Sequence, residues 1–100
     1  MDAIEFGKRI LKKEGYDHWD IILLKMGGGG RVSKMEMAVL IDENNKYDFG
    51  LVLHEIAHIT SDRLTGDSHD VLYADALTEL IRKYMSPNLI DEWERSITPG

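Results

Sequence analysis

The stretch Asp48-Phe-Gly-Leu-Val-Leu-His-Glu-Ile-Ala-His58 decides how this chain folds. Its apolar residues recur on most sides of a helix, so we expect this helix to lie at the centre of the protein. Asp48 stands where the N-cap of such a helix belongs. Because His54 and His58 are four residues apart, both imidazoles face the same way, one helical turn above the other.

The pattern from His54 to His58 is an HExxH motif, which is typical of a zinc-binding helix. Imidazole suits Zn²⁺ better than Mg²⁺ or Ca²⁺, although iron, cobalt or nickel could occupy the same site. Glu55 lies close enough to reach a metal-bound water and act as a general base. The alternative is that the two histidines only pack in a core helix. Buried imidazole and carboxylate groups need polar partners, however, and a metal ion supplies them.

A catalytic zinc site takes three protein ligands and a water molecule. His69 is the first candidate for the third ligand, because the residues after His58 allow the chain to turn at Gly66 and return over the site. Glu79 is the second candidate, since a carboxylate from the following helix completes the other common class of these sites. Ten helical positions span roughly 15 Å, so His69 and Glu79 cannot both reach one ion from the same straight helix.

The rest of the chain predicts a small α+β domain in the order α-β-β-α-α-α, with a small sheet packed on the HExxH helix. Helical spacing predicts a first helix over residues 2–14 and a later one over residues 72–85. Strand-forming residues predict two strands, Trp19 to Met26 and Arg31 to Ile41, joined as a hairpin by the glycines 27–30. A short helix is expected over residues 88–95. The 100 residues suffice for one domain, residues 1–100.

The composition restricts the kinds of metal site and of partner that the protein can have. The chain has no cysteine, so any metal must be held by histidine and carboxylate. Its net charge of −6 argues against nucleic acid as a partner. No apolar run approaches the roughly 20 residues that cross a bilayer, and the N-terminus lacks the apolar centre of a signal peptide. We therefore expect a cytoplasmic protein with no membrane partner.

Two segments resemble a known family. The stretch from Trp19 through the glycine run to Asp42, followed by Asn45 to His58, is similar to the core of SprT-like zinc metallopeptidases, the Spartan and WLM relatives. The motif His69-Asp-Val-Leu-Tyr73 is similar to that family's second metal motif. The resemblance implies a minimal zincin-like fold, a base and three zinc ligands, which would be Glu55 and His54, His58 and His69. The ending Tyr84-Met-Ser-Pro87 gives a weaker resemblance to ImmA/IrrE-like metallopeptidases.

Both resemblances imply peptide hydrolysis with one Zn²⁺ per chain and a protein or peptide as substrate. We expect an extended substrate to pair with the free edge of the strand Arg31 to Ile41. Tyr73, Tyr84 and Arg63 are candidates to stabilise the oxyanion. The alternative function is a non-catalytic or latent zinc-binding module that acts by protein binding, and in the latent form the segment after Pro87 covers the cleft. The presence of Glu55 favours catalysis, because a structural zinc site needs no base.

Overall fold

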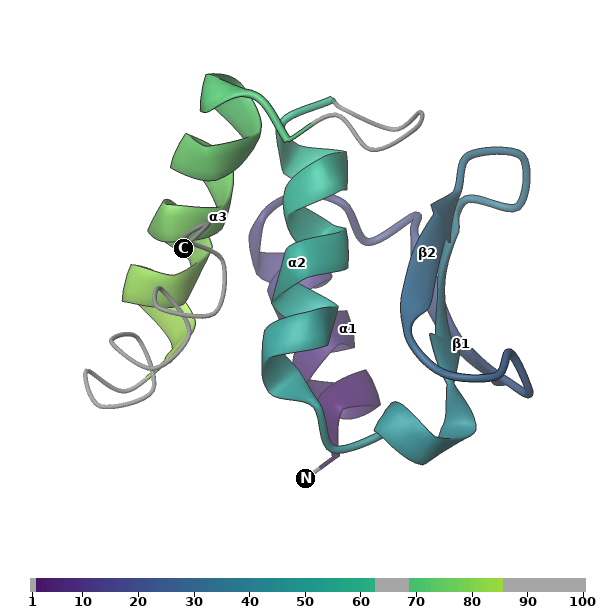
Figure 1. The fold of residues 1–100 in the computed structure, drawn as a ribbon. Coiled ribbons are helices and arrows are strands. Elements are labelled where there is room, and N and C mark those ends of the chain that lie inside the picture. The colour runs from purple at the N-terminus through teal and green to yellow at the C-terminus, as the bar shows by residue number, and fades with distance from the viewer. Residues whose placement is uncertain (1, 63–68, 86–100) are drawn as a thin grey trace.

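The computed structural model describes residues 2–62 and 69–85, which fold as an α+β domain (Figure 1). The fold class and the order of helix, strands and two further helices are confirmed, and the helix predicted over residues 88–95 lies outside the described residues. In chain order, the elements are α1 (Ala3–Lys13), β1 (Asp20–Leu24), β2 (Gly30–Ser33), β3 (Ala38–Asp42), a 3₁₀ turn (Glu43–Asn45), α2 (Phe49–Thr60) and α3 (Val71–Tyr84).

The three strands pair in the order β1-β3-β2, which corrects two predictions. The strand predicted from Arg31 to Ile41 is divided into β2 and β3, which pair antiparallel as a hairpin around residues 34–37. The glycines 27–30 therefore do not connect a hairpin, because β1 pairs in parallel with β3 and never with β2. Polar and charged residues at the turn, together with Met37 in a left-handed conformation (φ 49°), break the apolar pattern that suggested one long strand.

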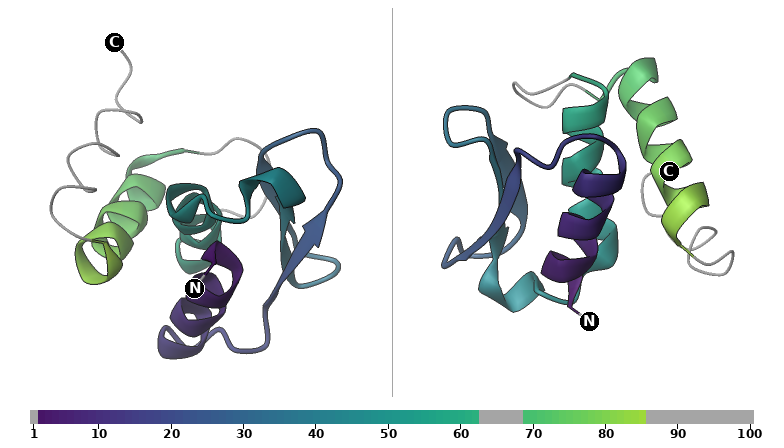
Figure 2. Two further views of the ribbon diagram at one scale, coloured as in Figure 1. Left: turned by 90° about the horizontal axis from the view of Figure 1, so that it is seen from below. Right: turned by 180° about the vertical axis from the view of Figure 1, so that it is seen from behind.

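Helix α2 occupies the centre of the domain, as its apolar sequence predicts. Both α1 and α2 cover one face of the sheet, and α3 packs against α2 on the side away from the sheet (Figures 1 and 2). Val52, Leu53 and Ile56 of α2 are fully buried, and they join one core with side chains from α1, β1, β3 and α3. The sheet and α3 thus hold α2 from opposite sides.

Helix α1 approaches the sheet closely because one of its buried residues is Gly7. A Cβ atom at this position would overlap Ile21 Cδ1 and would stand 2.6 Å from Val52 Cγ1. The N-cap of the helix is Asp2, whose side chain accepts a hydrogen bond from the Glu5 amide, and Gly15, just past its C-cap Glu14, has φ +86°. A glycine in this conformation terminates a helix without steric cost.

The loop before β2 is held by two side chains at the end of β3 and in the turn that follows it, Asp42 and Asn45. Asp42 is buried, and its carboxylate accepts hydrogen bonds from the amides of Met26 (2.7 Å) and Asn44 (2.9 Å). Asn45 Oδ1 accepts from the Gly29 amide at 3.1 Å. These bonds fix the position at which β2 starts, beside α2. Among the helices of residues 2–62 and 69–85, none combines the length and the apolar character needed to cross a membrane.

Candidate metal centre

Helix α2 positions the first two histidines as predicted. Asp48 is its N-cap, and the Asp48 carboxylate accepts a hydrogen bond from the Leu51 amide at 3.0 Å. The ring centroids of His54 and His58 lie 5.3 Å apart, so the two imidazoles stand side by side on one face of the helix. His58 is buried and His54 is half-buried.

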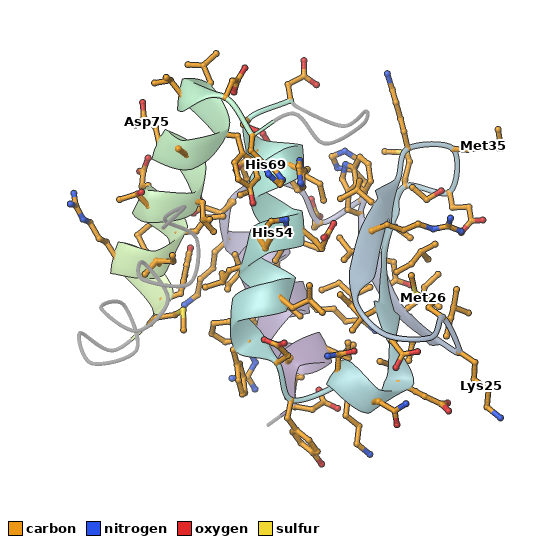
Figure 3. All side chains as sticks on the ribbon, viewed as in Figure 1. Lys25, Met26, Met35, His54, His69 and Asp75 are labelled. Atoms are coloured by element: carbon orange, nitrogen blue, oxygen red, sulfur yellow. The ribbon has the colours of Figure 1, made fainter. Side chains whose placement is uncertain are left out.

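His69 joins them from the segment that leads into α3. Its ring centroid lies 5.0 Å from that of His54 and 5.1 Å from that of His58, which makes a nearly equilateral triangle of imidazoles. His54 and His69 lie next to each other on the side of α2 that faces the viewer (Figure 3). One ligand nitrogen from each of the three rings lies within 4.8 Å of the other two, so this group could hold a metal ion.

The spacing of the nitrogens suits a tetrahedral ion. Two nitrogens bound at 2.0–2.1 Å to a tetrahedral zinc stand about 3.3–3.4 Å apart. His58 Nε2 and His69 Nε2 are separated by 3.3 Å. One ligand nitrogen from each of the three histidines lies within 4.8 Å of the other two.

Glu79, the alternative third ligand, lies elsewhere. Its carboxylate is exposed and forms an ion pair of 3.2 Å with Lys83, one turn further along α3. Together with Glu14 and Tyr16 it lines a separate cavity of about 250 Å³, to which none of the three histidines contributes. The structure therefore brings His69, and not Glu79, to the other two histidines.

Burial shifts the pKa values of two groups at this site, His54 and Glu55. Burial, and then the nearby charges of His58 and His69, lower the pKa of His54 to about 4, so its imidazole is neutral at physiological pH. Burial raises the pKa of Glu55 to about 7. Glu55 Oε1 lies 4.0 Å from His54 Nε2. A carboxyl group with a pKa near neutrality can both take up and release a proton.

Tyr73 supports the triad from α3. The ring of Tyr73 is buried, and its hydroxyl donates a hydrogen bond to the backbone carbonyl oxygen of His54 at 3.2 Å. Burial, and then the charge of Glu55, raise the pKa of Tyr73, so the hydroxyl stays protonated. A phenol has one O–H donor, and this bond uses it. The structure therefore does not present Tyr73 as an oxyanion stabiliser.

The other candidates fall outside the triad or outside the described residues. The Tyr84 hydroxyl donates to Glu14 at 2.8 Å, and Tyr84 lies three helical turns beyond Tyr73. Asp70, next to His69, caps α3 by accepting a hydrogen bond from the Tyr73 amide at 3.0 Å. Arg63 belongs to a segment that the structure does not describe.

The strand beside Glu55 is β2, a contact that the sequence analysis does not predict. A Cβ atom at Gly30, the first residue of β2, would lie 3.5 Å from Glu55 Cγ and 3.0 Å from the Leu40 carbonyl oxygen. Strand β3 is paired on both sides, so the part of Arg31 to Ile41 with a free edge in the described sheet is β2 alone. Nothing in the sequence marks Gly30 as the glycine that adjoins the helix.

Comparisons with protein-family models, with curated proteins and with solved structures give no match for this chain. The function has to be argued from the site itself.

Proposed function

We propose that this protein is a zinc-dependent metallopeptidase. The observation that carries the proposal is the meeting of His54, His58 and His69, with Glu55 beside them. Three imidazoles suit Zn²⁺, and a three-ligand site leaves a fourth position for water or substrate.

The roles of the residues follow from this arrangement. When bound, zinc supplies a Lewis acid that lowers the pKa of water and polarises a carbonyl group. Glu55 accepts the proton of the attacking water and returns it to the leaving amine. Its position next to the first histidine, with a pKa of about 7, supports both transfers.

The substrate we propose is an extended peptide. Strand β2 lies beside α2 at Gly30 and Glu55, and its outer edge is unpaired in the described sheet. A peptide that adds to this edge gains backbone hydrogen bonds and passes the carboxylate of Glu55. Because Gly30 has no side chain, β2 itself lies close to the Glu55 side chain.

The test is a Glu55→Gln variant, assayed with a peptide-library digest read by mass spectrometry. We expect the variant to retain one zinc per chain by elemental analysis and to lose cleavage by ~10²–10⁴-fold, because the amide cannot accept the proton. Glu79→Gln is the matched control, since this glutamate is exposed and lies away from the histidines. Wild-type protein that binds zinc but cleaves no peptide would instead support a binding module.

A further inference from the structure

All three imidazoles of the candidate metal centre contact one aromatic ring, that of Tyr73. Its centroid lies 4.6 Å from the His69 ring, in a stacked arrangement at 29°. It lies 4.5 Å from the His58 ring at 35°, and 5.5 Å from the His54 ring at 67°. The ring therefore forms a shared wall against which the imidazoles pack.

Contacts through ring faces leave the nitrogens of the imidazoles available. The faces of His58 and His69 rest against Tyr73 while their Nε2 atoms approach each other to 3.3 Å. Offset and edge-on aromatic contacts stabilise a pair of rings beyond the area that they bury. Packing of this kind restricts the rotation of a side chain without using its donor atoms.

The position of Tyr73 is itself fixed at both ends of the residue. Its amide donates to the carboxylate of Asp70, the N-cap of α3. Its hydroxyl donates to the backbone carbonyl oxygen of His54, in α2. The side chain is 4% exposed, so this link between the helices is shielded from water. His69 directly precedes Asp70. Tyr73 is therefore hydrogen-bonded both to the neighbour of the third histidine and to the backbone of the first, His54.

We propose that Tyr73 is the positioning residue of the metal centre, setting the relative orientation of His54, His58 and His69 before the ion binds. The ring sets the planes of His58 and His69, and the hydroxyl sets the distance between α3 and the first histidine. This inference rests on the metal-binding part of the proposed function and is independent of peptide hydrolysis.

The experiment compares Tyr73→Phe and Tyr73→Leu with wild-type protein. The first variant keeps the ring and removes the hydroxyl, and the second removes both. Zn²⁺ affinity is measured by competition with a fluorescent chelator at fixed pH. We expect Tyr73→Leu to weaken binding by ~10–100-fold and Tyr73→Phe by less, because partners that orient metal ligands have effects of this size. Thermal unfolding in chelator shows that each variant is folded.

Tyr84→Leu is the matched control, because Tyr84 is a half-buried tyrosine on the same helix that packs against the core and contacts Glu14. The visible spectrum of the Co²⁺-loaded protein gives a second readout, since its bands report ligand geometry. We expect the bands to change in Tyr73→Leu and to be unchanged in Tyr84→Leu. If Tyr73→Leu does not fold, the affinity and spectrum of Tyr73→Phe decide the matter.

The outcomes separate the two proposals. Wild-type zinc affinity and an unchanged cobalt spectrum in both Tyr73 variants would overturn the positioning role and leave the metal site standing. Equal losses in the Tyr73 and Tyr84 variants would also overturn it, because they would show a general effect of loosening α3. A wild-type protein that binds neither ion would contradict the metal site itself.

Discussion

His58 Nε2 and His69 Nε2 lie 3.3 Å apart, although eleven positions separate the two residues in the chain. His58 sits near the end of α2, and His69 is placed just before the N-cap of α3. The contact therefore joins two helices at their adjacent ends. A metal ion shared by these nitrogens would bind the helices together.

We expect His69→Ala to weaken zinc binding by roughly 10-fold or more, because even residues that only orient a ligand have effects of 10–100-fold. Glu79→Ala is expected to leave the affinity near that of wild type, since Glu79 pairs with Lys83 and lines another cavity. Competition with a fluorescent chelator at fixed pH measures both. The reverse ranking would assign the site to the glutamate-ligand class and withdraw the SprT-like interpretation.

Zinc should stabilise the fold. An ion that binds only the native state adds about 2.7 kcal/mol when its free concentration is 100 times its Kd. For a domain of this size, that corresponds to a rise in Tm of roughly 10 °C or more. Thermal unfolding followed by circular dichroism, with and without chelator, measures the shift. His54→Ala should abolish it, and an equal shift in that variant would show that zinc binds elsewhere.

Gly7→Ala should destabilise the protein by about 1–3 kcal/mol, the usual cost of overpacking a core. Alanine favours a helix interior by about 1 kcal/mol over glycine, so a surface site would show the opposite sign. At Gly7 the added methyl group would overlap Ile21 and crowd Val52. Urea unfolding measures the change, and Lys12→Ala on the exposed side of α1 is the control. A stabilised Gly7→Ala variant would contradict the close approach of α1.

The ionised Asp42 carboxylate should stabilise the protein at neutral pH, and this contribution to the free energy of unfolding should be lost in acid. The Met26 amide, followed by that of Asn44, lowers the pKa of this carboxyl group below its ordinary value of 3.8. A lowered folded-state pKa stabilises the protein above the unfolded pKa, and the contribution is lost as the pH falls through the folded pKa. The Asp42→Asn variant should therefore be less stable than the wild type at pH 7. As the pH falls below about 4, the variant should lose less stability than the wild type does.

Urea midpoints at pH 7, 5 and 3 in chelator test this expectation for Asp42. The control is Asp17→Asn, an exposed residue before β1. Parallel pH profiles for the wild type and Asp42→Asn would show that this carboxylate does not hold the glycine loop through its charge.

Much of the site could be predicted because its residues lie close together in the sequence. The four-residue spacing of His54 and His58 follows from helix geometry alone, and the Asp48 cap marks where that helix begins. The return of His69 is a short-range event, limited by the few residues available after His58.

The sheet was harder to predict, because pairing between strands is set by contacts distant in sequence. Asp20 pairs with Ala38, and Gly30 pairs with Ile41, while the apolar residues of β1 are equally compatible with a hairpin to β2. The position of Gly30 beside Glu55 depends on this long-range packing. No local pattern of charge or hydrophobicity encodes it.

The nearness in sequence of the three histidines also bears on when, during synthesis, the chain would first be able to bind a metal ion. All three lie within residues 54–69, so the triad requires the closure of only one short loop. The entropic cost of closing a loop rises with the logarithm of its length, so this closure is among the least costly in the chain. The pairing of β1 with β3 is no prerequisite for it. A nascent chain could therefore capture zinc through α2 and the start of α3, and the captured ion would then guide the docking of these helices.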